Sequence, residues 1–565
     1  MREIDRLTTE RYATPSLLLM EQAAAASVRA IAARRPDGLA GRSVRVLCGR
    51  GNNGGDGAAL ARQLCLQGAF VDVALLGRVA EAKGDARINF EIARSLMNVH
   101  ALEANQQVGA SESSAIKLFA ASGANLNFIE CTTEAEWFDF IHSGKRAPDI
   151  IVDALFGTGL TRPLEGLPRE AVGYINRFRA NVAKQNFAGL VVALDIPSGL
   201  NADAAEPIGA AVTADLTVTF TAPKPANVLP PAAQFNGELV VADIGSPFQL
   251  IEACASQLFV AEAADAQRWL EQTRYTPDSY KNTHGHALII AGSRHMTGAP
   301  VLTSDAAMRA GAGLVTLATP QSAHAAVAAR VMPEVMTAAL AETEAGAVSE
   351  AALAEVKRLA ERANVLALGP GLTADDELTR RFVRALVAER TTPLVVDADG
   401  LNALAPWPAE LRGTNERPLV LTPHIGEMRR LLGRDEHDTL ADRVAVARAF
   451  ATAHELILVL KGARAIIAAP DGRVVVNSTG NAGLGTAGAG DTLTGIITGC
   501  LAQAYGTLKD RADAFQTVVA AIYLAGLAGD FAARAQGMRT MVASDIREHF
   551  GAAVCALDAA GEAPR

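Results

Sequence analysis

The chain has 565 residues, of which 50% are hydrophobic and 20% are charged, so it is long enough to form the cores of two large globular domains. Its formal net charge is −9 and it contains no long basic run, which argues against nucleic acid as a partner. It has no uncharged apolar stretch long enough to span a membrane, and its six cysteines form no C-x-x-C pair. We therefore expect a cytoplasmic protein without a membrane partner, a disulfide frame or a zinc site.

Short apolar runs alternate with longer helical patterns along the whole chain. In the first half we predict strands at 43–48, 71–76, 150–153 and 191–195, and a short strand at 238–244. In the second half we predict strands at 287–291, 314–318, 365–368, 394–397, 419–422 and 456–460. Because these runs are almost continuously aliphatic, they predict strands buried on both faces. The alternation with helices predicts α/β layers throughout.

A glycine-rich segment, Cys48–Gly57, follows the first predicted strand and precedes a helical run. Glycines allow the backbone to turn tightly and present successive N–H groups to an anion. Gly49, Gly51 and Gly54 satisfy G-x-G-x-x-G, but the next strand ends Leu75-Leu76-Gly77, without the acid that would hold a ribose. This disfavours ordinary hydride transfer. A purely structural glycine turn is the alternative, although such a turn does not require Asn53 or Asp56.

Two further strand ends of the first half carry polar side chains. Asp153 precedes a Gly/Thr-rich loop, 154–160, and Asp195 precedes Ile-Pro-Ser198-Gly. Each aspartate taken alone is as typical of a turn or helix cap as of catalysis. Because open α/β sheets bind ligands beyond the carboxyl ends of their strands, we expect these residues and Asn53 to converge on one crevice.

The composition changes between Gly245 and Tyr275, where an alanine- and acid-rich segment, 261–271, separates the two strand series. We predict a first domain at 1–247, a linker at 248–275 and a second domain at 276–550.

The second half presents three strand-end loops before its most specific motif. These are Gly369–Leu372, Thr422–Glu427 and Lys461-Gly462, the last followed by a hairpin that turns at Asp471-Gly472. A lone histidine such as His424 is more often structural than catalytic. Lys461 is suited to a phosphate, or is simply an exposed lysine at a strand end.

The most specific motif is the glycine-rich loop Asn481–Gly495, which leads into helical sequence. Several N–H groups at a helix N-terminus favour an anionic phosphoryl group, and Asp491 beside them is able to take the proton of a hydroxyl. A plain helix start with an acidic first turn is the alternative, but it needs fewer glycines than this loop contains.

The segments Asn52–Gly57, Asp153–Leu160 and Asp195–Gly199 resemble, in this order, the signature loops of the NAD(P)H-hydrate epimerase family. The resemblance covers nearly all of residues 1–245 and implies a Rossmann-like three-layer domain. It implies that Asp195 is the substrate-facing acid/base and that Asn53, Asp153 and Ser198 hold a potassium ion, for which oxygen ligands are suitable. The substrate-binding residues that it implies are Asn52, Asn53, Gly54, Gly55, Asp56, Gly157, Thr158, Gly159, Leu160, Thr161, Arg162, Pro163 and Asp195.

The loop at 481–495 resembles the ribokinase-like superfamily, and the three earlier loops narrow the resemblance to ADP/ATP-dependent NAD(P)H-hydrate dehydratase. The resemblance covers about residues 276–550 and implies a dehydration driven by ADP or ATP with Mg²⁺, with Asp491 as the catalytic acid/base. The implied contacts to the hydrated cofactor are Ala299, Gly371, His424 and Asp491. The implied contacts to the adenine nucleotide are Lys461, Gly462, Ala463, Arg464, Ala465 and Gly490.

Three positions depart from these families. Gln22 stands where we expect Asn, while Ala465 and Ala489 each lack a hydroxyl that is common near the nucleotide. Together the resemblances predict a repair enzyme that acts on NAD(P)HX, with an adenine nucleotide, as a homo-oligomer. The alternatives are a kinase for a vitamin-like alcohol with a regulatory first domain, and a first domain that serves only as an interaction scaffold.

Overall fold

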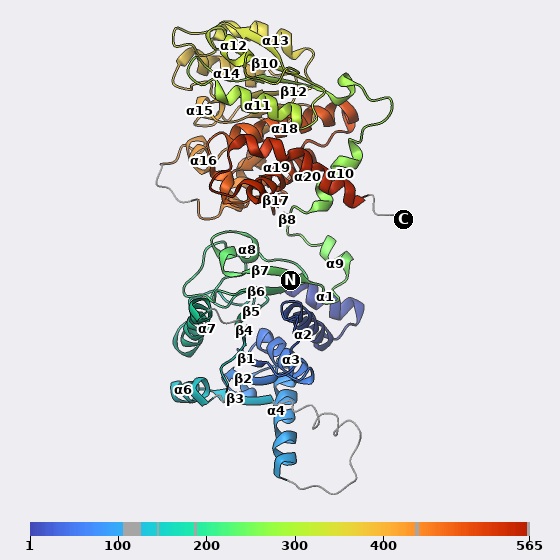
Figure 1. The fold of residues 1–565 in the computed structure, drawn as a ribbon, viewed down its shortest axis with the longest axis vertical. Coiled ribbons are helices and arrows are strands. Elements are labelled where there is room, and N and C mark those ends of the chain that lie inside the picture. The colour runs from blue at the N-terminus through green and yellow to red at the C-terminus, as the bar shows by residue number, and fades with distance from the viewer. Residues whose placement is uncertain (106–125, 144–145, 186–188, 436–439, 562–565) are drawn as a thin grey trace. The chain divides into compact units, whose positions relative to one another are not determined.

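The computed structural model describes residues 1–105, 126–143, 146–185, 189–435 and 440–561. The chain divides into two compact units, Met1–Ala255 and Ser256–Arg565 (Figure 1). The division falls within the predicted boundary region, but residues 256–275 belong to the second unit and are not a linker. They contribute β8 (Leu258–Val260), which pairs with β17 (Val474–Val476), and α10 (Ala263–Gln272), which buries Trp269 against the helical layer. The second unit also continues past residue 550, through α20 (Ala543–Gly561).

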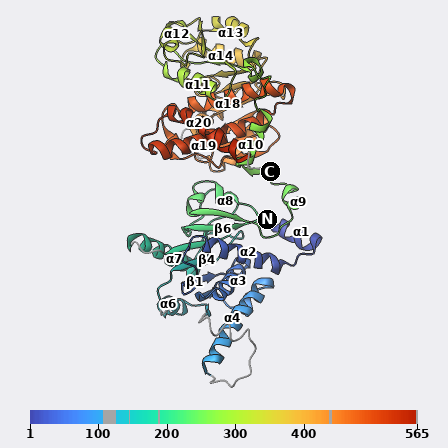
Figure 2. The same ribbon diagram turned by 45° about the vertical axis from the view of Figure 1, so that its right-hand side comes forward.

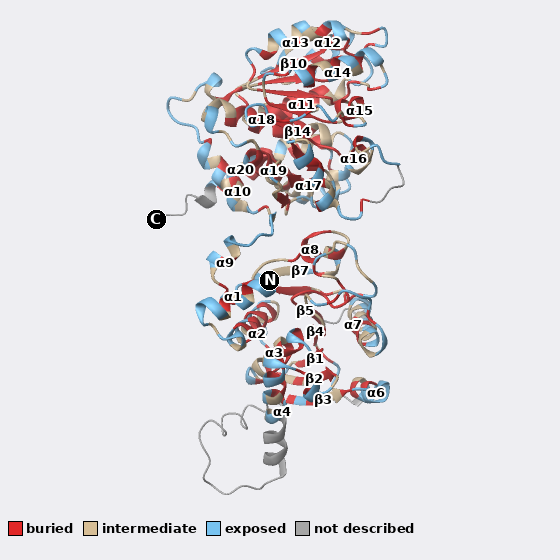
Figure 3. Cartoon of the chain, turned by 180° about the vertical axis from the view of Figure 1, so that it is seen from behind, coloured by how far each residue is buried: buried red, intermediate tan, exposed pale blue. Residues whose placement is uncertain are grey.

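A seven-stranded sheet, entirely parallel, forms the centre of the first unit, with strand order β3-β2-β1-β4-β5-β6-β7. Its strands are β1 (Ser43–Cys48), β2 (Phe70–Leu76), β3 (Leu126–Cys131), β4 (Ile150–Ala154), β5 (Leu190–Leu194), β6 (Leu216–Phe220) and β7 (Glu238–Ala242). The central strands β1, β4 and β5 are buried along their whole length, as their aliphatic sequences predict (Figure 3).

Helices cover both faces of this sheet and give three layers. One face is covered by α2 (Ser16–Ala32), α3 (Asn52–Leu66) and α4 (Gly84–Asn105), and the other by α6 (Glu134–Ser143) and α7 (Gly166–Gln185). The other described α-helices of this unit are α1 (Arg2–Tyr12), α8 (Pro225–Val228) and α9 (Phe248–Glu252).

The strand order reverses between β1 and β4. After β1 the chain adds β2 and β3 on one side, and it then returns to place β4 on the other side of β1. The loops that follow β1 and β4 consequently diverge at the carboxyl edge of the sheet, which is where open α/β sheets bind their ligands. This is the crevice that the sequence predicts.

The second unit contains a ten-stranded mixed sheet with the order β11-β10-β9-β12-β13-β14-β15-β16-β17-β8. The strands not yet given are β9 (His286–Ile290), β10 (Leu314–Pro320), β11 (Met336–Leu340), β12 (Val365–Leu368), β13 (Leu394–Val396), β14 (Leu419–Leu421), β15 (Ile457–Leu460) and β16 (Ile466–Ala468). From β11 to β15 all neighbours are parallel, whereas β16 runs antiparallel to both β15 and β17. The hairpin predicted at Asp471-Gly472 is the connection between β16 and β17.

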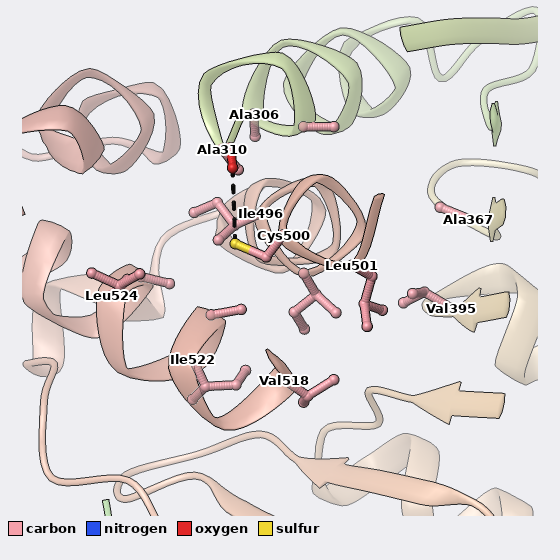
Figure 4. Close-up of a cluster of buried hydrophobic side chains, with 14 of the residues drawn as sticks. Ala306, Ala310, Ala367, Val395, Ile496, Cys500, Leu501, Val518, Ile522 and Leu524 are labelled. Atoms are coloured by element: carbon pink, nitrogen blue, oxygen red, sulfur yellow. Dashed lines mark hydrogen bonds between the residues drawn. The ribbon is translucent and has the colours of Figure 1, made fainter. Parts of the chain in front are cut away.

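The helix α18 (Ala489–Leu508) is packed between α11 (Gly298–Arg309), α19 (Ala514–Gln536) and the sheet. Two glycines let α18 approach α11: a Cβ on Gly495 would lie 2.2 Å from the Thr303 carbonyl oxygen, and one on Gly499 would lie 2.4 Å from that of Ala307. The next residue, Cys500, lies in the apolar core with Ile496 and Leu501 (Figure 4). This packing fixes the position of the N-terminus of α18.

Helices α19 and α20 lie side by side (Figure 2). By length and composition α19 is the one described helix that is able to cross a membrane, but most of it is buried in this core. The remaining helices are α12 (Gln321–Ala328), α13 (Leu353–Ala360), α14 (Glu377–Glu389), α15 (Asp399–Ala403), α16 (Ile425–Leu431) and α17 (Arg443–Ala453).

Candidate active sites

The glycine-rich turn of the first unit runs from the end of β1 into α3. Close backbone packing requires two of its glycines: a Cβ on Gly49 would lie 1.9 Å from the carbonyl oxygen of Leu155, and one on Gly54 would lie 1.8 Å from that of Gly49. The turn is therefore held against the loop that follows β4. Packing accounts for these glycines, as the structural alternative proposes, but it leaves Asn53 and Asp56 unexplained.

A cavity of about 610 Å³ lies at this crevice, within the size range of small-molecule sites. The predicted residues that line it are Asn52, Asn53, Asp56, Gly157, Thr158, Gly159, Leu160 and Asp195. The predicted residues that do not line this cavity, all within the described part of the chain, are Gly54, Gly55, Asp153, Thr161, Arg162, Pro163 and Ser198. Gln22 is exposed on α2 and does not line the cavity either. Loops from three different strand ends thus contribute polar side chains to the crevice.

Asp153 and Ser198 form the buried junction of two of these loops. The Asp153 carboxylate accepts hydrogen bonds from the Ser198 hydroxyl at 2.6 Å, the Ser198 N–H at 2.7 Å and the Leu155 N–H at 3.2 Å. The Ser198 hydroxyl oxygen accepts from the Phe156 N–H at 2.9 Å. Burial nevertheless raises the pKa of Asp153 to about 6, against these hydrogen bonds, which lower it. A nearby cation would favour the ionised carboxylate.

The side chain of Asn53 is buried, and neither its Oδ1 nor its Nδ2 has a hydrogen-bond partner. A Cβ on Gly157 would lie 3.4 Å from the Asn53 amide carbon and 3.3 Å from Asp195 Oδ2, so the amide and this carboxylate both approach the same glycine. A buried amide without partners is costly, so its position here indicates a ligand that satisfies it.

Asp195 occupies the left-handed region of backbone space, with φ at 65°, and its carboxylate is paired with Lys224. The Lys224 ammonium also donates to the Thr219 hydroxyl at 2.9 Å and to the Phe220 carbonyl at 3.0 Å. Lys224 is 5% exposed and lines the cavity. This lysine was not predicted from the sequence because it follows β6, a strand that we did not predict. Its place beyond a strand end was the only available signal.

Three more carboxyl groups line the same cavity, Asp56 from α3, Asp5 from α1 and Asp85 from α4. Burial, followed by the charge of Asp195, raises the pKa of Asp56 well above its ordinary value. Burial also raises the pKa of Asp5, whose Oδ1 has no hydrogen-bond partner. The cavity therefore combines one buried cation with several acid/base groups, which is suited to moving protons on a bound substrate.

The second site lies at the N-terminus of α18. Its loop contains Gly488, whose φ of 83° favours glycine. Asp491 lies in the first turn of the helix. Burial raises the pKa of Asp491 to about 6; the charge of Asp397 adds to this rise, and Lys461 opposes it.

Lys461 follows β15 and donates a 2.6 Å hydrogen bond to Asp397, the residue after β13. The other Asp397 oxygen accepts from the Thr494 hydroxyl of α18 at 2.7 Å. A Cβ on Gly490 would lie 3.4 Å from the Lys461 ammonium nitrogen, so the anion-binding loop and the lysine are adjacent. The structure therefore brings together Lys461, Gly490 and Asp491, and it adds Asp397 and Thr494, which sequence analysis did not single out.

His424 begins α16 as its N-cap. Its Nδ1 accepts from the N–H groups of Gly426 at 2.9 Å and Glu427 at 3.2 Å, so the neutral ring carries its proton on Nε2. Burial lowers the pKa of His424, which keeps the ring neutral. Nδ1 thus has the structural role that is common for a lone histidine, while the Nε2–H is able to donate a hydrogen bond to a substrate.

The other predicted substrate contacts, Gly371 and Ala299, meet each other: a Cβ on Gly371, where φ is 68°, would lie 3.2 Å from the Ala299 Cβ. The predicted nucleotide residues Gly462, Ala463, Arg464 and Ala465 form the connection from β15 to β16. In that connection Arg464 donates to the Ser478 carbonyl, and the Ala465 carbonyl accepts from the Asn477 N–H at 2.8 Å. Ala489 is the first residue of α18.

Comparison with known proteins covers both sites. A family model described as YjeF-related protein N-terminus matches residues 16–226, and one described as NAD(P)H-hydrate dehydratase matches residues 287–550. The bifunctional NAD(P)H-hydrate repair enzyme Nnr of Moorella thermoacetica is 40% identical over 549 residues, which cover 97% of this chain and 94% of that protein. The chain belongs to the family of bifunctional NAD(P)H-hydrate repair enzymes.

Other members of this repair family are similar over most of their length. The Coxiella burnetii enzyme is 32% identical, with 97% of each chain covered, and the Escherichia coli enzyme is 31% identical, with 94% of this chain and 87% of that protein covered. Among solved structures, the Bacillus subtilis ADP/ATP-dependent NAD(P)H-hydrate dehydratase co-crystallized with ATP/Mg²⁺ is 27% identical, covers 54% of this chain and 100% of that chain, and has a TM-score of 0.44.

The predicted fold class is confirmed: a Rossmann-like three-layer domain precedes a ribokinase-like α/β domain in this family member. The predicted family is confirmed as well. These matches do not favour the alternative that the chain is a kinase for a vitamin-like alcohol.

Proposed function

We propose that the chain repairs hydrated NADH and NADPH: its first unit interconverts the R and S epimers of NAD(P)HX, and its second unit dehydrates the S epimer at the expense of ADP. The observation that carries this proposal is the presence of two separate acid/base sites, around Asp195 and Asp491, in a chain whose halves match the two repair activities. A scaffold would not require the group of carboxylates, amides and a lysine that lines the cavity of the first unit.

In the first site, Asp195 accepts the proton of the C6 hydroxyl. The C6–N1 bond then breaks, C6 becomes an aldehyde, and N1 keeps the electron pair and takes the proton from Asp195. After rotation, N1 gives this proton back to Asp195 as it attacks the other face of the aldehyde, and Asp195 returns the proton to the new C6 hydroxyl of the opposite epimer. Lys224 supports this chemistry because it balances the charge of Asp195, and both residues are buried.

In the second site, Asp491 accepts the C6 hydroxyl proton while that oxygen attacks the terminal phosphorus of ADP, and AMP leaves. Phosphate then departs from C6, and C5 loses a proton, which yields the dihydronicotinamide. The N–H groups at the α18 N-terminus and the Lys461 ammonium lie where they would bind the transferred phosphoryl group.

The residues of the first site fit a potassium ion. One carboxylate, one hydroxyl and one unpartnered amide oxygen form a hard donor set of low charge, suited to a monovalent cation. Asn53, Asp153 and Ser198 would hold it, and its charge would stabilise ionised Asp153. For Mg²⁺, the described residues contain no group of three or more His, Cys, Asp or Glu side chains that could cage a metal. The ion would therefore enter on the nucleotide phosphates.

We place the reaction in the cytoplasm, in keeping with six cysteines that are all free thiols. ADP is the nucleotide we propose, and the homo-oligomer expected from the sequence stays a prediction.

The test is the absorbance of NADH recovered from a mixture of both hydrate epimers, with and without ADP. The proposal predicts complete recovery with ADP and none without it. ADP-dependent phosphorylation of an unrelated alcohol without NADH recovery would instead support a kinase.

A further inference from the structure

The described part of the second unit contains a buried carboxylate that neither reacts in the proposed mechanism nor was singled out by its sequence. Asp397 is 1% exposed and uses both of its oxygens, one for the Lys461 ammonium and one for the Thr494 hydroxyl. A buried carboxylate is costly unless it is paired and hydrogen-bonded, and here it is both. The pairing connects the end of β13, the end of β15 and the second turn of α18.

This pair lies directly against the anion-binding loop. A Cβ on Gly490 would be 3.4 Å from the Lys461 ammonium nitrogen and 3.7 Å from Asp397 Oδ2, so these groups border the helix N-terminus where we place the phosphoryl group. Glu427, the only other described acid paired with Lys461, is farther away, at 3.8 Å, and its oxygen also accepts from the His424 N–H at 2.7 Å. Asp397 is therefore the main partner that decides where the ammonium lies.

We propose that Asp397 is a positioning residue of the dehydration reaction: one carboxylate oxygen holds the Lys461 ammonium beside the phosphoryl-binding loop, and the other anchors α18 so that Asp491 meets the substrate. The inference rests on the proposed function. It gives the second unit a residue that acts through Lys461 and Asp491 and does not itself touch the reacting atoms.

The charges around Asp491 make this role measurable. The groups that act on it are Asp397, Asp399 of α15, Glu427 of α16 and Lys461. Among them the charge of Asp397 contributes most to raising the pKa of Asp491, and Lys461 lowers it. If Asp397 loses its charge, one of the charges that raise the pKa of Asp491 disappears, and Lys461 is freed to approach Asp491. Both changes lower the pKa of Asp491.

The experiment measures ADP-dependent dehydration of the S epimer by the full chain as a function of pH and ADP concentration. Asp397→Asn keeps the side-chain shape but removes its charge. We expect the KM for ADP to rise at least about tenfold, because Lys461 is no longer held, and the acid limb of kcat/KM to move to lower pH by roughly one unit. An unchanged ADP KM together with an unmoved acid limb would overturn the proposal.

Asp399→Asn is the matched control. Asp399 also bears on Asp491, but its oxygens accept from the Thr373 N–H at 2.9 Å and the Asn402 amide at 3.4 Å, and it has no recorded contact with Lys461. We expect its ADP KM to stay within about twofold of the wild type and its acid limb to move less than that of Asp397→Asn. Equal effects of the two variants would mean that general charge removal, and not the hold on Lys461, is responsible.

A second variant keeps the test decisive if Asp397→Asn does not fold. Asp397→Glu retains the charge but displaces the carboxylate, so the ADP KM should rise while the acid limb stays in place. A wild-type ADP KM in that variant would contradict the positioning role. Wild-type protein that fails to regenerate NADH at all would instead refute the proposed function.

Discussion

Each unit pairs a lysine with an aspartate at the end of a strand, but the two aspartates have different expected roles. In the first unit Lys224 is paired with Asp195, the same residue that we expect to exchange a proton with the substrate. In the second unit Lys461 is paired with Asp397, while the expected acid/base, Asp491, lies apart on α18. In the first site the lysine thus neutralises the carboxylate that is expected to react. In the second site the lysine neutralises a carboxylate next to the one that is expected to react.

This difference has a chemical consequence. Asp491 has no direct cationic partner among the recorded contacts of the described residues, so burial and the Asp397 charge raise its pKa to about 6. It is therefore able both to accept and to release a proton near neutral pH, as a residue that first deprotonates a hydroxyl needs to do. In the first site, by contrast, the Lys224 ammonium lies beside the Asp195 carboxylate, and further carboxyl groups, among them Asp5 and Asp56, line the same cavity.

We expect the strongest loss of activity when Asp491 is replaced and Asp195 is left intact. Asp491→Asn should reduce dehydration by at least about 10²-fold, because the acid/base group is lost. ADP binding, measured by calorimetry, should persist, since Lys461 and the loop N–H groups remain. Epimerisation by the same chain serves as the internal control and should be unchanged. Near-normal NADH formation would remove Asp491 from the mechanism.

Replacement of Lys224 tests whether the first site needs a cation beside Asp195. Lys224→Met leaves Asp195 in a buried site without its cation, so epimerisation should fall about 10- to 100-fold, and the first unit should lose about 3 kcal/mol of stability. The measurements are epimer exchange followed by chromatography and thermal unfolding. Dehydration of pure S epimer should be unaffected; a loss of both activities would indicate global unfolding.

The pH dependence of dehydration follows from the raised pKa of Asp491. The base form is required, so kcat/KM should decrease as the pH falls through about 6, by roughly tenfold at pH 5. The profile should be recorded with S epimer and saturating ADP, over a range in which light scattering shows no unfolding. A rate that is flat from pH 7 to 5 would mean that Asp491 does not act as the base.

The smallest expected effect concerns the cation of the first unit. Exchange of potassium for lithium should slow epimerisation severalfold and lower the unfolding temperature of the first unit by a few degrees, because a ligand that binds only the native state stabilises it. Asn53→Ala should abolish that dependence on the cation, since it removes the unpartnered amide oxygen. If the wild type is indifferent to the cation, the proposed potassium site is wrong.

Much of the fold was predictable because its central strands are aliphatic and uninterrupted. β1 agrees with the predicted 43–48, and β12 with 365–368. In contrast, β6 alternates threonine with apolar residues, Leu-Thr-Val-Thr-Phe, and has no continuous aliphatic run. It was missed, and Lys224 was missed with it. β8 is only three residues long and gains its strand character from β17, a partner more than 200 residues away, so local sequence did not reveal it.

The candidate sites were predictable where a motif lies within one loop. Asn53, Asp195 and Asp491 each stand at the end or start of a recognisable element. The role of Asp397 was not predictable, although it was correctly placed at a strand end, because its partners are Lys461 and Thr494, far along the chain. Such contacts depend on how strands and helices assemble, which motif spacing does not encode.

Two independent sites that act on one freely diffusing substrate should complement each other between two variant chains. Full-length Asp195→Asn is given an equal mixture of hydrate epimers with ADP, and NADH is followed by absorbance. NADH should form rapidly and then stop near the S fraction, apart from slow spontaneous epimerisation. Addition of full-length Asp491→Asn, which keeps its epimerase site, should then drive conversion to completion. A plateau that persists after this addition, while each variant retains its other activity, would mean that the two sites do not share a free substrate.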